Sequence, residues 1–378
     1  MTIGFLTQYY RGLGHSQRIK FIAEETAKYN DVVIMDQLFL PPIDYCVPHI
    51  AFLKDYDVPN LNSVFQFIQQ APMINFRIKQ FINTIEKYDV KILVCEGFPF
   101  CRQQFAHEYF RYFEECKKRG IKIVISIRDF PWDEPHNTSL QDWVLYTQNV
   151  VCLHYADKIL IHGDEEILPL LSDRTRHSHS SQIIKSIKHM LYYTGYVCDE
   201  QQPKHNKKNN NIFVSTGLNK DESVYLFKNI AKIASKFSDY NFIMPVANKY
   251  QKISGKRNKN IYLVEYVPKL RNKLTNCAAY ITYGGYNATV EILQGQIPSI
   301  VIPRQSGKKL EQFVRAYTFE PYDFFKVMTM AEAGNVENLL EELLTNYKPN
   351  PFEFNLKGAS NSAKFLSEMY NGLCNSRA

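Results

Sequence analysis

The segment of the sequence best suited to bind a ligand is residues 278–316, in which a glycine turn precedes several polar side chains. Gly284 and Gly285 stand where a short apolar run gives way to a helical pattern. Glycine lets the backbone approach a ligand closely, and the N-terminus of a helix favours negative charge. We therefore expect this turn, with Tyr286 and Asn287 at the start of the helix, to bind a phosphate or diphosphate.

Three polar side chains follow this turn. Glu291 lies in the same helical pattern, and a carboxylate can accept hydrogen bonds from both hydroxyls of a ribose. Glu311 and Gln312 form an acid–amide pair that can bind the hydroxyls of a hexose. The alternatives are a glutamate on a helix surface and two ordinary helix-starting residues. Phosphate, ribose and hexose are the parts of a nucleotide sugar, so these residues predict a ligand of that class.

A second glycine-rich turn, with Gly12 and Gly14, lies near the start of the chain. It can bring the backbone close to an acceptor or a diphosphate. His15 follows directly, and an imidazole, whose unperturbed pKa lies near operating pH, suits removal of a proton from a hydroxyl. Arg18, one helical turn further, could neutralise a phosphate. The alternatives are a helix-capping histidine and a surface arginine.

More polar residues stand at the ends of apolar runs. Glu96 ends one run, and Arg128 and Asp129 end the next. Because the carboxyl ends of parallel strands line the ligand crevice of an α/β sheet, these residues are expected to bind an acceptor or to orient His15. The alternative is an Arg128–Asp129 pair that only fixes loops. Trp132, in the loop that follows, could stack on a sugar or a flat acceptor.

Apolar runs of strand length alternate with helical patterns along most of the chain. The strands predicted in the first half are residues 3–7, 32–35, 90–95, 121–127 and 158–162. Those predicted in the second half are residues 212–214, 241–244, 261–264, 279–282 and 299–302. Continuous apolar strands separated by helices indicate parallel sheets with both faces covered.

A polar segment, residues 199–211, interrupts this alternation and is expected to be an interdomain linker. The sequence therefore predicts an α/β protein of two doubly wound Rossmann-like domains, residues 1–198 and 212–360, facing each other across a cleft. The last segment, residues 361–378, is expected to form a helix that crosses back to the first domain.

Composition limits the classes of function. The chain has 378 residues, of which 45% are hydrophobic and 14% aromatic, enough for two sizeable cores. The net charge of +7 suits phosphorylated ligands, an anionic membrane surface or merely a solvated basic face, and we predict no nucleic-acid partner. The eight cysteines are scattered without a C-x-x-C pair, which indicates reduced thiols and a cytoplasmic location. No membrane-spanning run or export signal is expected.

Several motifs, in their order and spacing, resemble those of the GT-B glycosyltransferases, and most of all the predicted enzymes related to the MurG-type N-acetylglucosaminyltransferases. The motifs are GLGHSQR at 12–18, EGFPFCRQQF at 96–105, SIRD at 126–129, ADKILIHGD at 156–164, YTGYV at 193–197, YGGYNATVEIL at 283–293, then Pro303-Arg304 and Glu311-Gln312. They cover most of the chain. The resemblance implies that the first domain binds the acceptor and the second the nucleotide sugar.

The activity that the resemblance implies is transfer of a hexose or derivative from a nucleoside-diphosphate sugar, here UDP, to an acceptor hydroxyl with inversion. His15 would remove the proton, aided by Glu96 or Asp129. The acceptor could be a glycan, a lipid-linked sugar or a small molecule, and a lipid-linked acceptor would add a peripheral membrane contact. The sequence leaves the oligomeric state open.

The resemblance also assigns donor contacts to further residues of the second domain. They are Ser215, Thr216 and Gly217 for phosphate, Tyr266 and Val267 for the base, Tyr283 beside the glycine turn, and Arg304 for the sugar. No D-x-D sequence suited to metal-held diphosphate is visible, and the H-x-H pair at 177–179 lacks further ligands. We therefore predict no metal cofactor, with the helix dipole and side-chain donors stabilising the leaving diphosphate.

Three other functions share this pattern. One is a nucleotide-sugar hydrolase of the pseudaminic-acid-pathway type, which has the same G-x-G-H-x-x-R signature and uses water in place of an acceptor. Another is a nucleotide-sugar 2-epimerase. A third is a catalytically silent GT-B partner protein, against which the intact His15, Glu291 and Glu311-Gln312 argue.

Overall fold

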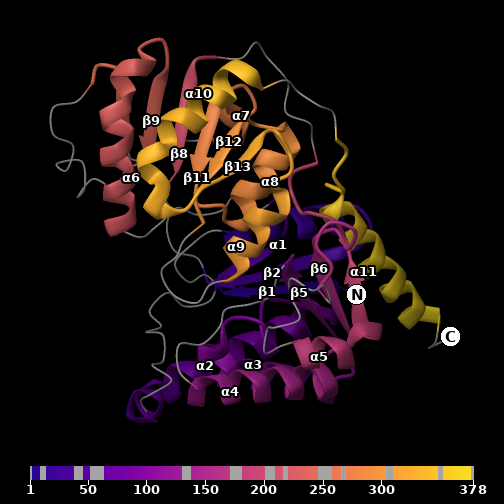
Figure 1. The fold of residues 1–378 in the computed structure, drawn as a ribbon. Coiled ribbons are helices and arrows are strands. Elements are labelled where there is room, and N and C mark those ends of the chain that lie inside the picture. Colours follow the sequence, from indigo (N-terminus) through magenta and orange to yellow (C-terminus); the bar gives the residue numbers. More distant parts are fainter. Residues whose placement is uncertain are drawn as a thin grey trace. The chain divides into compact units, whose positions relative to one another are not determined.

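The computed structural model describes residues 2–8, 14–37, 46–51, 64–129, 138–170, 181–200, 209–215, 220–245, 258–264, 267, 270–303, 310–347 and 352–375 (Figure 1). The chain divides into two units, each built on its own parallel sheet. The first unit is Met1–Glu200 together with Asn355–Ala378, and the second is Gln201–Phe354.

The first unit contains a seven-stranded sheet whose strands are all parallel. In spatial order they are β3 (His49–Ala51), β2 (Asp31–Gln37), β1 (Thr2–Gln8), β4 (Val90–Glu96), β5 (Lys122–Arg128), β6 (Lys158–His162) and β7 (Leu191–Tyr193). The order reverses between β1 and β4, so the carboxyl ends of these two strands flank the topological switch point. In doubly wound sheets, ligands bind at such a point.

Helices cover both faces of this sheet. They are α1 (Gly14–Thr26), α2 (Val64–Lys87), α3 (Ala106–Lys118), α4 (Thr138–Val150), α5 (Ser181–Ser186) and α11 (Gly358–Asn375). Apolar residues of α1 and α11 share one core with β1, β2, β4 and β5. The helices α2, α3 and α4 lie together on the other side of the sheet (Figure 1). A fully buried ion pair, with 2.6 Å between Arg77 Nε and Glu108 Oε1, joins α2 to α3.

The C-terminal segment belongs to the first unit, although the sequence between Glu200 and Asn355 forms the second. The Tyr196 amide donates to the Asn355 carbonyl at 2.7 Å, and the Gly358 amide donates to the Tyr196 carbonyl at 3.0 Å. The return to the first unit therefore begins earlier in the sequence than the helix expected at 361–378. The second unit ends at Phe354, and α11 starts at Gly358.

The second unit contains a six-stranded parallel sheet. In spatial order its strands are β10 (Ile261–Val264), β9 (Asn241–Pro245), β8 (Asn211–Ser215), β11 (Ala279–Thr282), β12 (Ser299–Val301) and β13 (Phe325–Val327). The order reverses between β8 and β11. In the register of these two strands, Phe213 lies opposite Tyr280 and Ser215 opposite Thr282. These four side chains therefore share one face of the sheet.

The opposite face of this sheet packs against α6 (Lys220–Ile233) and α10 (Val336–Asn346) in a single apolar core. The remaining helices are α7 (Leu270–Leu274), α8 (Tyr286–Gly295) and α9 (Leu310–Phe319). Of these, α8 lies on the Tyr280 side, because its Glu291 is close enough to Tyr280 to affect that hydroxyl electrostatically.

All ten predicted strands are present, with ends that differ by at most two residues. The strands that sequence patterns missed are β3, β7 and β13, each three residues long and each at the edge of its sheet. Three residues are too few to show a periodicity, so only pairing with a neighbour identifies them. No helix in the described residues is both long and apolar enough to cross a membrane.

Candidate functional site

The first cluster of site residues lies at the switch point of the first unit. His15 is in the first turn of α1, directly after β1, and Glu96 is the last residue of β4. The distance from His15 Nδ1 to Glu96 Oε1 is 2.8 Å. Glu96 is 1% exposed and His15 is 17% exposed, so a ligand can reach the imidazole but not the carboxylate. Glu96, Arg128 and Asp129 were the residues expected to orient His15. Of these, the structure places Glu96 in hydrogen-bond contact with the imidazole.

Arg18 is buried on the same helix and has a role that the sequence did not suggest. Its Nη2 forms a hydrogen-bonded ion pair with Glu96 Oε1 and lies 3.3 Å from His15 Nδ1. The predicted phosphate contact is corrected to this ion pair, because a guanidinium 2% exposed and bonded to a carboxylate inside the unit neutralises that carboxylate instead.

Electrostatics fix the charge of this cluster. Burial by itself would raise the pKa of Glu96, but Arg18 and the hydrogen bond from His15 hold it below its usual range. Burial and the nearby Arg102 lower the pKa of His15 to about 3, against the opposing effect of Glu96. At neutral pH, Glu96 is therefore ionised and His15 is neutral.

The proton of neutral His15 belongs on Nδ1. The shortest contact of Nδ1 is to an ionised carboxylate, which can only accept. Nε2 is then the basic nitrogen, and among the described residues it has no hydrogen-bond partner. The lowered pKa makes His15 a weaker base than the free imidazole that the sequence suggested. Glu96 offsets part of this by stabilising the imidazolium that forms when Nε2 takes a proton from a hydroxyl.

Three further polar side chains extend this cluster across the sheet, and sequence reasoning gave them no role. Ser126 Oγ lies 2.5 Å from Glu96 Oε2 and 2.8 Å from His162 Nε2. His162 Nδ1 lies 2.8 Å from Thr194 Oγ1. All three are fully buried. Ser126 and His162 lie on β5 and β6, toward the carboxyl edge of the sheet. A polar residue near the end of an apolar run was also the signal that made Glu96 a candidate.

The other predicted residues of the first unit are less closely involved. Asp129 is buried beside Gly163, where an added Cβ would lie 2.9 Å from the Asp129 Cβ, and Arg128 is half-buried. Gly14 is the first residue of α1. Gly12 and Trp132 lie outside the described residues.

The second cluster lies at the switch point of the second unit, where β11 leads into α8. Gly284 has a φ of 66°, and a Cβ there would lie 2.6 Å from Val301 Cγ1, so both conformation and packing require glycine. An added Cβ at Gly285 would meet no atom within 4 Å, so open space lies over this residue. Gly284 is therefore required by the local backbone and packing, whereas Gly285 leaves open space beside the turn.

The N-terminus of α8 fits an anion. Gly285 caps it without any side-chain hydrogen bond. The amides of Asn287 and Ala288 lie in the first turn, where an α-helix provides no acceptor of its own. Thr289 Oγ1 is buried without a hydrogen-bond partner among the described residues and lies 4.0 Å from the added Cβ at Gly284. These donors and the helix dipole together can bind a phosphate.

Two aromatic residues expected to contact the donor are packed inside the unit. Tyr283 is 4% exposed and belongs to the core formed with α6 and α10. Successive side chains of a strand point to opposite faces of the sheet, so Tyr283 points away from the face that carries Thr282. Tyr286 is 3% exposed, with its ring 5.7 Å from the Arg315 guanidinium. Both side chains are buried, so the donor contacts expected of these two residues stay a prediction for their backbone groups.

Glu291 is half-buried on α8 and, among the described residues, has no hydrogen bond or ion pair. Burial raises its pKa to about 7, partly offset by Arg271. On the adjoining sheet face, the Tyr280 hydroxyl bonds to Ser215 and Thr282. Burying the Glu291 carboxylate costs free energy unless it accepts hydrogen bonds, and none of the described residues donates one. Hydroxyl groups of a ligand could supply them.

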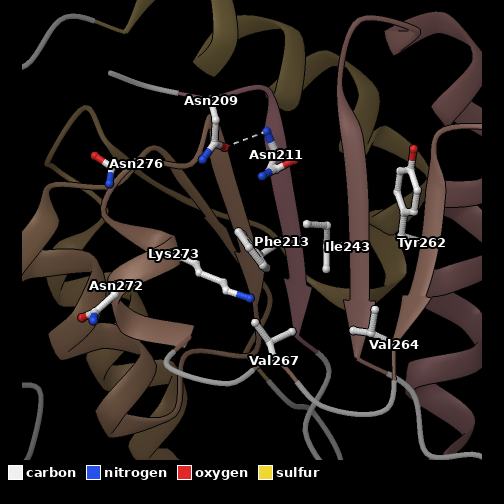
Figure 2. Close-up of a pocket in the computed structure, with 10 residues that line it drawn as sticks. All are labelled: Asn209, Asn211, Phe213, Ile243, Tyr262, Val264, Val267, Asn272, Lys273 and Asn276. Carbon is white, nitrogen blue, oxygen red and sulfur yellow. Dashed lines mark hydrogen bonds between the residues drawn. The ribbon is translucent and has the colours of Figure 1, made fainter. Parts of the chain in front are cut away.

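A pocket of about 500 Å³ lies on the same sheet face (Figure 2). Phe213, Ile243 and Val264 form its apolar floor, and Val267 lies at the carboxyl end of these strands. The Lys273 side chain extends over the floor from α7 (Figure 2). Val267 is the described member of the pair expected to hold the base.

The remaining donor residues are partly described. Glu311 is 5% exposed in the first turn of α9, whereas Gln312 is half-buried. Thr216, Gly217, Tyr266 and Arg304 lie outside the described residues. No group of three or more His, Cys, Asp or Glu side chains in the described part of the chain could hold a metal ion.

The fold matches solved glycosyltransferases along its whole length. The structure of the glycotransferase of kitacinnamycin is 12% identical, covers 98% of both chains and has a TM-score of 0.61. MurG of Acinetobacter baumannii is 10% identical, covers 98% of this chain and 100% of its own, and has a TM-score of 0.56. At these identities the likeness establishes the fold, which is GT-B as the resemblance implied.

The sequence itself supplies the family. Residues 193–370 match the glycosyltransferase family 28 C-terminal domain. The chain has the GT-B fold and carries a glycosyltransferase family 28 C-terminal domain.

A protein of Caenorhabditis elegans named as a UDP-glucuronosyltransferase, ugt-48, is 26% identical to this glycosyltransferase over 130 residues. The match covers 32% of this chain and 24% of the worm protein, so the chain spans about a quarter of that relative.

Proposed function

We propose that this glycosyltransferase moves a hexose or hexose derivative from a UDP-sugar to an acceptor hydroxyl by a single displacement that inverts the anomeric carbon, without a metal ion. His15 takes the proton of the acceptor hydroxyl on Nε2. The hydroxyl oxygen forms a bond to the anomeric carbon while the bond from that carbon to the diphosphate oxygen breaks. UDP leaves with both bonding electrons.

Proton removal is assigned to the first unit. The geometry that supports it is the 2.8 Å contact between His15 Nδ1 and Glu96 Oε1, which fixes the tautomer and leaves Nε2 basic. The buried carboxylate also stabilises the imidazolium in the transition state, as an oriented acid residue does for other catalytic histidines. This contact is the observation that carries the proposal.

Donor binding is assigned to the second unit. The α8 N-terminus, with open space over Gly285, would receive the diphosphate. Glu291 would accept the two ribose hydroxyls, and Gln312, with Glu311 and Arg304, would contact the hexose. The apolar floor of the pocket beside Val267 suits the flat face of a base. UDP is chosen as the nucleotide because the curated relative is named for a UDP-sugar.

The central test is His15→Ala, with His189→Ala as the matched control because His189 is exposed on the same unit and away from the cluster. Loss of a general base lowers turnover by about 10²–10⁴-fold. We expect that loss for His15→Ala, with the Kd for UDP unchanged, and wild-type turnover for the control. Turnover is measured as UDP release from a panel of UDP-sugars with sugar and lipid-linked acceptors.

Other outcomes would identify the competing functions. Free sugar released at full rate without any acceptor would indicate a hydrolase. A folded protein that binds no nucleotide and turns over none of the panel would indicate a silent partner. If His15→Ala keeps wild-type turnover, His15 is not the base.

A further inference from the structure

We propose that His162, a buried histidine that does not reach the substrate, is a positioning residue for the catalytic pair His15 and Glu96. It would act through Ser126, in a hydrogen-bond chain that runs from Thr194 to His15 across four neighbouring strands and α1. The inference rests on the proposed function of His15 for its kinetic consequence, but the chain itself can be tested without it.

The contacts of the chain are continuous and short. Ser126 Oγ lies 2.5 Å from Glu96 Oε2 and 2.8 Å from His162 Nε2. His162 Nδ1 lies 2.8 Å from Thr194 Oγ1. The side chains of Glu96, Ser126, His162 and Thr194 are all at most 1% exposed, so water does not compete for these bonds.

The direction of each bond follows from donor counting. Glu96 is ionised and can only accept, so the single Ser126 hydroxyl proton goes to Oε2. Ser126 Oγ must then accept from His162, which requires a proton on Nε2. Burial and the nearby Arg18 lower the pKa of His162 to about 3, so His162 is neutral and its Nδ1 is an acceptor. The Thr194 hydroxyl has three acceptors in reach, and His162 Nδ1 at 2.8 Å is nearer than the carbonyl oxygens of Gly195 at 3.0 Å and Ile161 at 3.3 Å. Every donor in the chain therefore points toward Glu96.

This arrangement constrains the carboxylate that orients the base. A glutamate side chain can rotate about its last torsion, and Oε1 must remain on His15 Nδ1. The Ser126 bond fixes Oε2, and donation from His162 polarises the Ser126 hydroxyl and strengthens that bond. Removing the His162 donor should loosen the carboxylate and with it the orientation of His15.

The chain also has an anchor at its far end. Thr194 follows β7, and its amide donates to the Ile161 carbonyl at 2.9 Å. Its carbonyl accepts from Asn361 Nδ2 on α11 at 2.8 Å. Thr194 is therefore held in place by both the neighbouring strand and the C-terminal helix, and it can fix the His162 ring in turn.

The first experiment measures tautomers in the full chain labelled with ¹⁵N-histidine, by long-range ¹H–¹⁵N correlation at pH 7. We expect wild-type His162 to be neutral with its proton on Nε2, and His15 to be neutral with its proton on Nδ1. In His162→Phe, which keeps a ring but no donor, the His15 Nδ1 resonance should shift, whereas His189→Phe should leave it unchanged. A charged His162, a proton on Nδ1 of His162, or an unchanged His15 resonance would overturn the proposal.

The second experiment measures kinetics. His162→Phe should lower kcat about tenfold, at the lower end of what outer hydrogen-bond partners of site residues contribute. The KM for the donor should stay within about twofold, because the donor is assigned to the other unit. His162→Gln can place an amide N–H near the position of Nε2, so it should recover most of the lost turnover. Equal turnover for all three proteins would overturn the positioning role.

The two experiments separate this inference from the proposed function. If His15→Ala keeps wild-type turnover, the proposed base is wrong, while the tautomers of His162 and His15 still decide whether the chain exists. If His162→Phe does not fold, the tautomers of His162 and His15 in the wild type decide it: a charged His162 or a proton on its Nδ1 would overturn the proposal.

Discussion

At the scale of single residues, the burial of each carboxylate determines what it can do. Glu96 is buried with three hydrogen-bond donors, Arg18, His15 and Ser126, so its charge is satisfied inside the unit. Glu291 is half-buried and has no such partner in the part of the chain that the structure describes, and burial raises its pKa to about 7. The first carboxylate is therefore suited to orient a catalytic side chain, and the second is suited to a ligand.

Replacing Glu291 by alanine should weaken UDP binding by about 10–100-fold, since hydrogen bonds to a charged group contribute about 1.5–3 kcal/mol. Stability should change little, because none of the residues that the structure describes loses a hydrogen bond or ion pair with Glu291. If Glu291 accepts both ribose hydroxyls, Glu291→Ala should weaken dTDP binding less than UDP binding, because the sugar of dTDP lacks the 2′-hydroxyl. Calorimetric titration with both nucleotides measures this, with Glu341→Ala on α10 as an exposed control. Unchanged UDP affinity would exclude the ribose role.

At the scale of elements, both sites lie where a sheet reverses its strand order. His15 follows β1 and Glu96 ends β4, while the turn before α8 follows β11 and Ser215 ends β8. The carboxyl ends of parallel strands leave backbone groups and loop side chains without partners in the sheet, which is why ligands bind there. Successive side chains of a strand point to opposite faces of the sheet, so only every second residue points to the site. Tyr283 is on the other face and packs in the core.

The glycine turn before α8 gives a paired prediction. Gly284→Ala should lower the free energy of unfolding by about 1–3 kcal/mol, because of its positive φ and the contact with Val301. Gly285→Ala should change stability by less than about 0.5 kcal/mol. Gly285→Leu should fill the open space and weaken UDP binding about tenfold or more, which is about 1.4 kcal/mol. Urea unfolding and calorimetry measure these effects, and full affinity in Gly285→Leu would place the diphosphate elsewhere.

At the scale of the whole molecule, buried polar groups should make stability depend on pH. His15 and His162 have pKa values lowered to about 3 in the folded chain and near 6.5 when unfolded. The unfolded chain binds more protons below pH 6.5, so the free energy of unfolding falls as the pH falls from 6.5 toward 3. Glu291, with its raised pKa, acts in the opposite direction between pH 4.5 and 7.

The histidine contribution can be isolated in the first unit, because both tryptophans, Trp132 and Trp143, belong to it. Urea unfolding followed by tryptophan fluorescence should show a steep loss of stability between pH 6 and 4.5. His162→Gln should reduce that slope by up to about 1.4 kcal/mol per pH unit. A His189→Gln control should not, since His189 is exposed. A slope unaffected by His162→Gln would mean that this histidine titrates normally.

The whole reaction is expected to proceed without a metal ion, because the α8 N-terminus is assigned to the leaving diphosphate. EDTA should leave the rate of UDP release unchanged. Inhibition by EDTA that Mg²⁺ reverses would contradict this assignment.

The sequence by itself determined ten of the strands, the two-unit α/β organisation and the polar positions at the strand ends. These features are local: an apolar run, a glycine turn or a charged residue after a strand can be identified from neighbours in the chain. The same local pattern placed His15, Glu96 and Glu291 among the candidate residues.

Only the tertiary structure decided which of these residues act together. Glu96 and Arg18 are 78 residues apart, yet they form one ion pair, while Ser126, His162 and Thr194 join them from separate strands. The pairing of the short edge strands also depends on partners far away in sequence, whereas the return of the C-terminal helix to the first unit was expected from the sequence and is confirmed. Contacts of this kind are set by sheet order and burial, which no local pattern encodes.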